Sequence, residues 1–374
     1  MNKERKKQRI FWLDLARTFA VISISLNHAV NRSYHIHVDQ MSEFLSIPLA
    51  STLFKTVIYV FSRIGVPLFL MISGSLLLRK KITDEEGIKK FYRTNYLDLL
   101  ITSEIWFFLM YCILSKGLLF SQGAFNVSAV PGFLCGLVKT MLFIDQVTFG
   151  NMWYLPMILC VYLMIPIFAL VFRNVSPRVI ALPCAIVFLS QMIITDINDL
   201  LRIGGSEKKF VFALDYKNIF SVYMLYVLIG YWISIGGLKR LRKELVACLA
   251  GAAFIVCCIF QLYAFSRPNN YLVAYDCSFI LITSMFLFEF IRRCKEPERI
   301  IKRCITYISK ISFGIFFVHI LIMTFLTRFS VLKDLPRPVY LIVLETISVG
   351  GSIVLIWLLS HIYICRRRLF LIKD

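Results

Sequence analysis

Residues 9–30, RIFWLDLARTFAVISISLNHAV, form a hydrophobic stretch long enough to cross a bilayer as a helix. About 20 residues at ~1.5 Å each span the hydrocarbon layer, which is ~30 Å thick. The stretch nevertheless contains four polar residues, Asp14, Arg17, Asn27 and His28. Ionisable groups inside a membrane are costly and usually functional. The stretch therefore predicts a first membrane-spanning helix that carries part of a site.

The spacing of these residues predicts a polar stripe along one face of this helix. Arg17 and His28 are eleven residues apart. At roughly 100° per residue, both side chains lie within about 20° of the same face, roughly 16 Å apart along the axis. Asp14 lies nearly one turn before Arg17 on almost the same face. A structural alternative is that Arg17 pairs with Asp14 and that His28 is an interfacial histidine near the helix end.

The composition is that of a polytopic helical membrane protein. The chain has 374 residues, of which 59% are hydrophobic and 17% are charged, with a mean hydropathy of +0.74. We predict an all-α integral membrane protein with about ten transmembrane helices in a single membrane domain, residues 1–374. Hydrophobic windows of ~19 residues place the spans near residues 10–31, 56–78, 95–115, 151–172, 177–195, 217–236, 244–265, 271–291, 305–327 and 338–364.

The basic residues predict the orientation in the membrane. The formal net charge is +20, but the Lys and Arg residues follow the predicted spans rather than forming a nucleic-acid surface. Outside the spans, 27 fall on one side and 12 on the other. The positive-inside rule then puts both termini in the cytoplasm. Asp14 and Arg17 interrupt the apolar core that a cleavable signal peptide requires, so we expect the first span to be retained.

Two further stretches place charges inside spans. Arg63 comes just before VPLFLMISGSLLL, residues 66–78, and needs an acidic partner or a water-filled cavity. His319 closes the run SFGIFFVH in the ninth span. With the predicted topology, His28, Arg63, His319 and Glu345 lie in the outer halves of four spans, which suggests one polar cavity. The alternative is a set of separate structural pairs, such as Arg63 with Glu345.

The most charged run, RKKITDEEGIKKFYRTNY at residues 79–96, is predicted to be cytoplasmic. Its Lys90 and Arg93 either anchor the protein on anionic lipid or bind phosphate groups. Metal ligands are not evident. His35 and His37 lie two residues apart without a third ligand, and the eleven cysteines lack metal-binding spacing. We therefore expect no metal.

Together these stretches resemble the acyltransferase 3 family of membrane-bound acyl-CoA-dependent O-acyltransferases. The resemblance rests on an arginine followed after ten residues by a histidine in the first span, on VPLFLMISG, on a basic pair at the third span and on SFGIFFVH. Lys90 stands where the family usually has arginine, and Phe316 where tyrosine is more usual. Lysine keeps the charge but loses the bidentate fork of arginine.

The resemblance implies an activity and roles. It implies transfer of acetyl from acetyl-CoA to a hydroxyl of a surface polysaccharide or lipid-linked glycan, as in the enterobacterial-common-antigen and O-antigen acetyltransferases. The bacterial cytoplasmic (inner) membrane, with its lipids, is the implied location, and no nucleic acid is expected as a partner. The implied catalytic residues are His28, Arg17 and Asp14.

The implied donor-binding residues are Lys90 and Arg93, at the cytoplasmic side, and an acceptor-side cavity would contain Arg63, His319 and Glu345. Another class of protein uses intramembrane charges as well: a transporter or flippase for a lipid-linked sugar or an anion. Inverted repeats and paired broken helices would favour that alternative.

Overall fold

The computed structural model describes residues 9–34, 36, 40–80, 82–121, 124–144, 152–211 and 220–372. Within these ranges the chain is helical apart from its loops and one antiparallel pair of two-residue strands, β1 (Phe120–Ser121) and β2 (Ala124–Phe125). The chain divides into two compact units. Unit 1 comprises residues 1–79 and 175–356, and unit 2 comprises residues 80–174 and 357–374. The predicted all-α class is confirmed.

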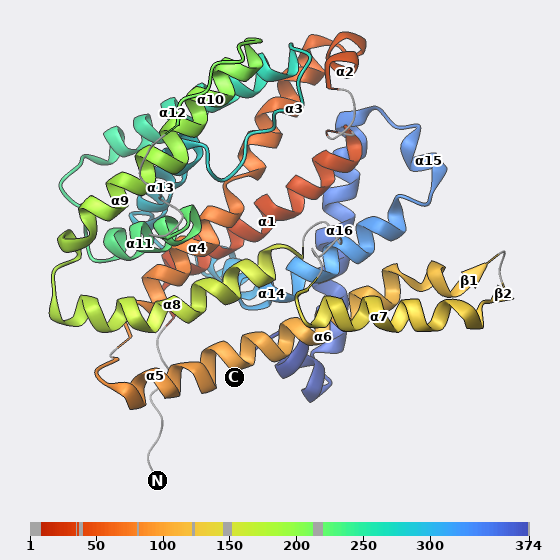
Figure 1. The fold of residues 1–374 in the computed structure, drawn as a ribbon, viewed down its shortest axis with the longest axis horizontal. Helices are drawn as coiled ribbons and strands as arrows, with labels where there is room; N and C mark the ends of the chain where they lie inside the picture. Colours follow the sequence, from red (N-terminus) through yellow and green to blue (C-terminus); the bar gives the residue numbers. More distant parts are fainter. Residues whose placement is uncertain are drawn as a thin grey trace. The chain divides into compact units, whose positions relative to one another are not determined.

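Unit 1 is built from most of the helices in the chain (Figure 1). Their bounds are α1 Phe11–Ser33, α2 Gln40–Ser46, α3 Leu49–Ser62, α4 Gly65–Leu77, η4 Pro177–Ile180, α9 Ala181–Phe188, η5 Leu189–Ile193, α10 Ile194–Ile203, α11 Val222–Ser234, α12 Lys243–Phe265, α13 Ser278–Arg292, α14 Arg299–Leu326, α15 Ser330–Lys333 and α16 Arg337–Leu359, whose last three residues belong to unit 2.

Unit 2 contains the remaining elements. They are α5 Glu85–Phe91, η1 Tyr92–Tyr96, α6 Leu97–Leu114, η2 Lys116–Leu119, β1, β2, η3 Val127–Ala129, α7 Val130–Met141, α8 Tyr154–Asn174 and η7 Cys365–Leu369. Helix α7 lies along α6 (Figure 1). Its Phe133 and Leu137 pack on Tyr111 of α6, while Leu134 and Val138 on the other face are exposed.

Seven helical segments are long and apolar enough to cross a membrane. They are Leu49–Leu77, Glu85–Leu114, Tyr154–Asn174, Pro177–Ile203, Lys243–Phe265, Arg299–Leu326 and Arg337–Leu359. The chain is therefore a multi-pass membrane protein. The predicted count of about ten is not confirmed, because α1, α11 and α13 are not among the seven. Each of these three nevertheless coincides with a predicted span, and the polar residues of α1 lower its hydropathy.

Two helices extend beyond the spans that the sequence predicts. Residues 85–94, predicted as part of a cytoplasmic loop, are helical and continue through η1 into α6. The second span begins at Leu49 rather than near residue 56, and it breaks between Ser62 and Gly65. Pro67 explains the break, because proline lacks the amide hydrogen that would bond the carbonyl of Arg63 and its ring clashes with that carbonyl.

Helix α1 crosses the middle of unit 1, with α14 on one side and α3 and α4 on another (Figure 1). Helices in lipid associate through close packing rather than the hydrophobic effect, so small residues belong at their contacts. Ala16 and Ala20 are fully buried, and a Cβ on Gly65 of α4 would lie 2.7 Å from the Ala20 carbonyl oxygen. Around the last turns of α1, a core forms with α3, α12, α14 and α16.

Helices α4 and α11 approach even more closely. A Cβ on Gly74 would lie 1.9 Å from the carbonyl oxygen of Val227, and one on Gly230 would lie 2.2 Å from that of Met71. The Ser75 hydroxyl donates to the Gly230 carbonyl across the same contact, at 2.9 Å. Both glycines are therefore required for the distance between the two backbones.

Candidate active site

The first half of the polar stripe on α1 is bound to α14. The carboxylate of Asp14 is buried. It forms a salt bridge with Arg9, with 2.5 Å between Nη2 and Oδ1, and accepts a hydrogen bond from Ser309 at 2.7 Å. One turn later, Thr18 donates to the carbonyl of Ile305 at 3.0 Å. These contacts favour a structural part for Asp14, which holds α1 against α14. Arg17 lies between them on α1 and is partly buried.

The second half of the stripe brings together two histidines, His28 and His319, which the sequence predicted to share one cavity. Their ring centroids are 5.5 Å apart and their planes are inclined by 37°. His28 is partly buried on α1, and His319 is fully buried on α14. The two rings belong to helices that are adjacent in space but almost 300 residues apart in the chain.

The hydrogen bond of His319 determines its tautomer. Its Nδ1 lies 2.6 Å from the carbonyl oxygen of Ile315. A carbonyl only accepts, so Nδ1 carries the proton and Nε2 of the neutral ring holds a lone pair. That Nε2 is buried and has no hydrogen-bond partner within the described part of the chain. A buried ring nitrogen without a partner costs free energy, which makes it a candidate contact for a substrate hydroxyl or a proton.

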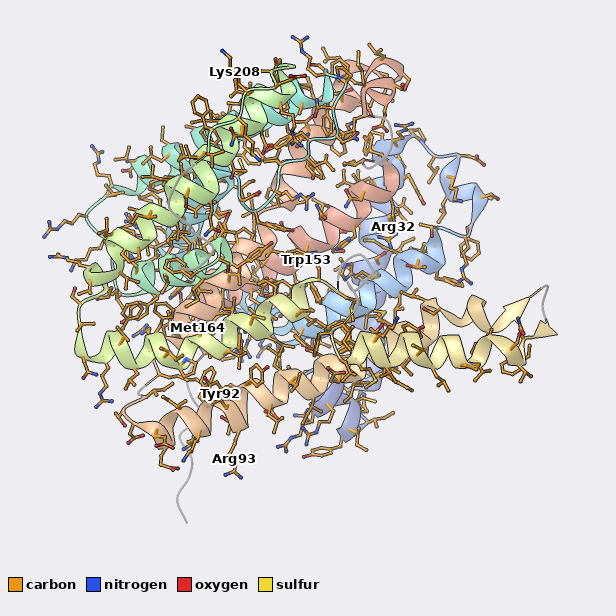
Figure 2. The ribbon with its side chains drawn as sticks, viewed as in Figure 1. Arg32, Tyr92, Arg93, Trp153, Met164 and Lys208 are labelled. Carbon is orange, nitrogen blue, oxygen red and sulfur yellow. The ribbon has the colours of Figure 1, made fainter. Side chains whose placement is uncertain are left out.

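Arg32 belongs to this group as well, although the sequence did not point to it. It lies one turn beyond His28, and its guanidinium donates to the His28 carbonyl at 3.4 Å and to the Thr324 hydroxyl at 3.3 Å. Figure 2 labels its position at the end of α1. A cation is thereby fixed beside the histidine pair by both helices. The spacing of four residues from His28 was the available signal, but Arg32 was assigned to the outer loop.

Arg63 lies at the break between α3 and α4 and is held by tyrosines. Its Nε donates to the hydroxyl of Tyr59 at 3.0 Å, and Nη2 reaches the same oxygen. The guanidinium carbon lies 4.7 Å from the centroid of the Tyr59 ring and 5.6 Å from that of Tyr275. Cation–π contact compensates for some of the lost hydration of a charge in a membrane. Of the two environments expected for Arg63, an acidic partner or a water-filled cavity, the acidic partner is not found among the described ion pairs.

Glu345 reaches the same part of α1 from α16. One carboxylate oxygen, Oε2, accepts from the Ser25 hydroxyl at 2.8 Å. The other oxygen is buried without a hydrogen bond in the described residues. Ser25 is three residues before His28, so both side chains lie on neighbouring positions of one helix face. The alternative pairing of Arg63 with Glu345 is not formed, since Arg63 binds Tyr59 and Glu345 binds Ser25.

The break at Arg63 is also where α1 meets α3. The carbonyl groups of Phe61 and Ser62 accept from the Ser23 hydroxyl at 3.0 and 3.1 Å. The Asn27 amide donates to the Ser62 hydroxyl at 2.9 Å. A broken helix leaves carbonyls without their usual partners, and side chains of α1 satisfy them. Successive positions of α1 thus bind α3, α14 and α16 by polar contacts.

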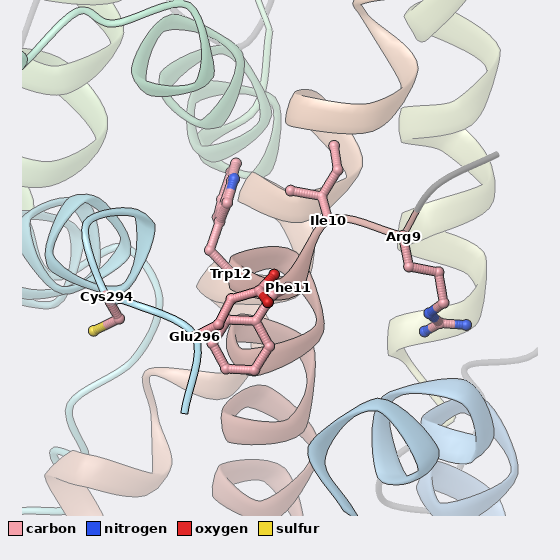
Figure 3. A pocket seen from close by; sticks show the side chains of 6 residues that line it. All are labelled: Arg9, Ile10, Phe11, Trp12, Cys294 and Glu296. Atoms are coloured by element: carbon pink, nitrogen blue, oxygen red, sulfur yellow. The ribbon is translucent and has the colours of Figure 1, made fainter. Parts of the chain in front are cut away.

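A cavity of about 320 Å³ lies at the start of α1 (Figure 3). Its walls include Trp12, Cys294 and Glu296, together with Arg9. Figure 3 shows the Arg9 side chain directed away from Trp12. Because the Arg9 guanidinium already binds Asp14 and Ser309, the described wall of this cavity offers no uncommitted cation to an anionic ligand.

Unit 2 contains the predicted donor-binding residues. Figure 2 shows Tyr92 and Arg93 pointing in opposite directions, Tyr92 toward α8, where its hydroxyl donates to the Leu163 carbonyl at 2.9 Å. Arg93 lines a cavity of about 450 Å³. Lys90 is exposed on α5 and is not among the described residues of the cavity wall. At the start of α5, the Gly87 amide and the Thr83 hydroxyl hold the pKa of Asp84 below its ordinary value.

A metal site was not expected from the sequence. In the described ranges, three or more His, Cys, Asp or Glu side chains do not gather closely enough to hold a metal ion. His35 and His37, whose spacing resembles that of metal ligands, lie outside the described residues.

The fold and the site define a class of protein: a multi-pass membrane protein with a histidine pair formed between its first helix, α1, and α14. A sequence model of the acyltransferase 3 family, described as an acyltransferase domain, matches residues 10–360, and the chain therefore belongs to that family. This confirms the resemblance inferred from the motifs. Neither a curated protein nor a solved structure matches the chain. The family membership supports the coarse activity, a membrane acyltransferase.

Proposed function

We propose that the protein is an O-acetyltransferase that moves acetyl from acetyl-CoA to a hydroxyl of a surface polysaccharide or a lipid-linked glycan. Membership of the acyltransferase 3 family supports the transfer of an acyl group. The observation that carries the site is the histidine pair, whose ring centroids are 5.5 Å apart. The buried Nε2 of His319 has no hydrogen-bond partner in the described chain. Two imidazoles on adjacent helices offer ring nitrogens that can accept and release a proton.

In this proposal His28 acts as the general base. It takes the proton of the acceptor hydroxyl while the hydroxyl oxygen attacks the thioester carbonyl, and the C–S bond then breaks to release CoA. An imidazole also serves as a nucleophile, so a transient acyl-histidine on His28 is the second form of the same step. Arg17, Lys90 and Arg93 hold the donor, and Arg63 or Glu345 adjusts the polarity around the acceptor.

His319 has a positioning role in the proposed mechanism. Its Nδ1–H is bound to the Ile315 carbonyl, so the ring presents only its Nε2 lone pair to a neighbour. A lone pair at that place accepts a hydrogen bond from a protonated His28 or from the acceptor hydroxyl. Arg32 keeps the His28 backbone in place through its bond to Thr324.

The location proposed is the bacterial cytoplasmic membrane, with both termini in the cytoplasm. The support is the excess of basic residues on one side of the spans, 27 against 12. A reporter fused after Asp374, or inserted after Ile82, is expected to read as cytoplasmic, and one inserted after Asn198 as external. An external reading after Ile82 would invert the assignment of the donor and acceptor sides.

A transporter or flippase is the second candidate, and the break between α3 and α4 at Arg63 is the observation that favours it. Transporters bind their substrates at interrupted helices, but these normally occur as pairs in corresponding repeats. The two functions differ in whether a thioester bond is broken. A transporter moves its substrate across vesicles without consuming acetyl-CoA.

The direct test is acetyl transfer by the purified full chain, with acetyl-CoA and glycan prepared from a strain that lacks the gene. We expect CoA release that depends on the glycan, and acetyl esters in the product by mass spectrometry. His28→Gln is expected to abolish both. His361→Gln is the matched control, because His361 is exposed and, among the described residues, its ring bonds the carbonyls of Trp357 and Leu358 at the helix end. Glycan transport without CoA release would establish the second candidate instead.

A further inference from the structure

The cavity that contains Arg93 has a second basic wall, from a segment distant in sequence. Besides Arg93 and Asp98 on one side, its lining includes Tyr363, Arg366, Arg367 and Ile372. Three guanidinium groups thus border one space of about 450 Å³, which is within the size range of small-molecule sites. From the sequence, Arg366 and Arg367 were only part of the basic excess that orients the chain.

The C-terminal segment is fixed to α6. The Trp106 indole donates to the Leu369 carbonyl at 2.9 Å. Phe370 and Ile372 are buried, and the Ile372 amide bonds the Arg366 carbonyl at 3.0 Å. These contacts hold the backbone of η7 opposite that of η1, so the arginines stay at the cavity although their side chains are partly or fully exposed.

Both basic walls lie on π-helical turns. Arg93 is in η1, and Arg366 and Arg367 are in η7. Such wide turns are rare and often occur at functional sites, because the extra residue changes the direction in which side chains leave the helix. A basic segment that only anchors to lipid needs no special backbone geometry. A wide turn is therefore present at each wall of the cavity, and a third, η5, lies outside it.

The charges at this cavity are unbalanced toward positive. Asp98 is the one acidic residue of the described wall, and Arg368 lies 3.8 Å from it. Arg367 donates to the Tyr363 hydroxyl at 2.8 Å, a contact that orients the guanidinium without neutralising it. Arginine forks match the oxygen atoms of phosphate and bind them bidentately. The chemistry that this cavity would recognise is that of phosphate groups.

We propose that this cavity binds the phosphate groups of a nucleotide, namely the nucleotide portion of the acyl donor, with Arg366 and Arg367 completing the site that Arg93 begins. This proposal rests on the proposed function for the identity of the nucleotide. The Tyr363 ring and the Ile372 side chain supply apolar surface for a base beside the phosphates. The headgroups of phospholipids also carry phosphate. The test therefore distinguishes binding of a nucleotide from binding of a lipid headgroup.

The probe is adenosine 3′,5′-bisphosphate, which carries phosphates but no thioester and so binds without reacting. Its Kd is measured by calorimetry on the full chain in nanodiscs of neutral phosphatidylcholine. Arg366→Gln and Arg367→Gln are each expected to weaken binding roughly tenfold, since a charge-assisted hydrogen bond is lost. Arg173→Gln is the matched control, an exposed arginine of the same unit outside the cavity wall, and should change Kd by less than about twofold.

Two further measurements keep the test decisive. Arg366→Lys and Arg367→Lys keep the charge and the fold, and they should recover part of the binding. The thermal unfolding midpoint of every variant is compared with that of the wild type. Equal Kd values for wild type and both Gln variants would overturn the proposal, as would a wild type that binds no bisphosphate. Loss of phosphatidylglycerol binding alone in the variants would assign the cavity to lipid and overturn it as well.

The nucleotide site and the proposed acetyltransferase function can be refuted independently of each other. If the bisphosphate binds through Arg366 and Arg367 but the wild type releases no CoA in the transfer assay, the nucleotide site stands and the acetyltransferase assignment falls. If CoA is released at equal KM for acetyl-CoA in wild type and both Gln variants, the activity stands and this site falls.

Discussion

The histidine pair of unit 1 and the arginine cavity of unit 2 differ in how they are held. His28 and His319 lie on two long helices, and the nearby α1 residues Ser25 and Asn27 are hydrogen-bonded to α16 and α3. The arginines are partly or fully exposed on short π-helical turns. Buried groups with fixed geometry suit a chemical step, in which small displacements are costly. Exposed cations suit capture of an anion, which tolerates more variation. The difference predicts distinct responses to mutation.

The largest effect is expected at His28. His28→Ala should lower acetyl transfer by roughly 10²–10⁴-fold, the usual contribution of a positioned base. His28→Gln should be equally inactive, because glutamine replaces a hydrogen bond but cannot take up the proton of the acceptor hydroxyl. The measurement is CoA release at matched expression, with His361→Gln as the control. Near-normal transfer by His28→Gln would remove this histidine from the mechanism.

A smaller effect is expected at His319, which acts through its neighbour. The amide of glutamine can replace the bond to the Ile315 carbonyl, so His319→Gln should fold and retain partial activity, with a loss of roughly ten- to a hundredfold. The readout is the dependence of kcat on pH. A positioning role predicts a shifted profile, because the environment of the His28 proton has changed. If activity falls but the dependence of kcat on pH does not shift, the role of His319 is limited to packing.

At the arginine cavity, the donor KM should change more than kcat. Arg93→Ala is expected to raise KM for acetyl-CoA roughly tenfold, with the defect deepening as salt screens the remaining contacts. Lys90→Ala should have less effect, since Lys90 is not in the described cavity wall. Lys89→Ala is the control, because Lys89 is paired with Glu85 on the exposed side of α5. An unchanged KM for Arg93→Ala would restrict this region to lipid anchoring.

The smallest effect is expected at Glu345. Glu345→Gln retains an oxygen that accepts from Ser25 and supplies an amide group for the second, unbonded position. We expect less than about a tenfold loss of kcat/KM, or about 1.4 kcal/mol in the barrier. Ser25→Ala removes the hydrogen bond that Glu345→Gln keeps, and its loss is expected to stay within the same tenfold limit. A loss as large as that of His28→Ala would make Glu345 the better candidate for the base.

Residue spacing predicted the parts of the site that lie on one helix. The face shared by Asp14, Arg17 and His28 follows from helical periodicity alone, and the depth of His319 follows from the limits of its span. The association of His28 with His319 also followed, since both belong to outer halves of spans. The roles of these residues remain predictions, to be tested by the variants above.

Contacts made by residues at or beyond the ends of the predicted spans could not be foreseen. Arg9, at the margin of the first span, pairs with Asp14, a contact that the spacing within the span does not predict. The helix at residues 85–94 was assigned to a loop because its charges obscured the helical pattern. The proximity of Arg366 to Arg93 depends on the bond from Trp106 to Leu369, and sequence periodicity carries no information on such distant contacts.

The close approach of α4 and α11 has a consequence for genetics. Any missense change at Gly74 or Gly230 adds at least a Cβ, which would meet a backbone carbonyl within about 2 Å. No allele at these two codons is conservative, although neither residue is near the reacting groups. A random-mutagenesis screen for lost glycan modification would therefore recover the glycines together with the histidines. Protein abundance in each isolate, rather than the phenotype, would tell the two groups apart.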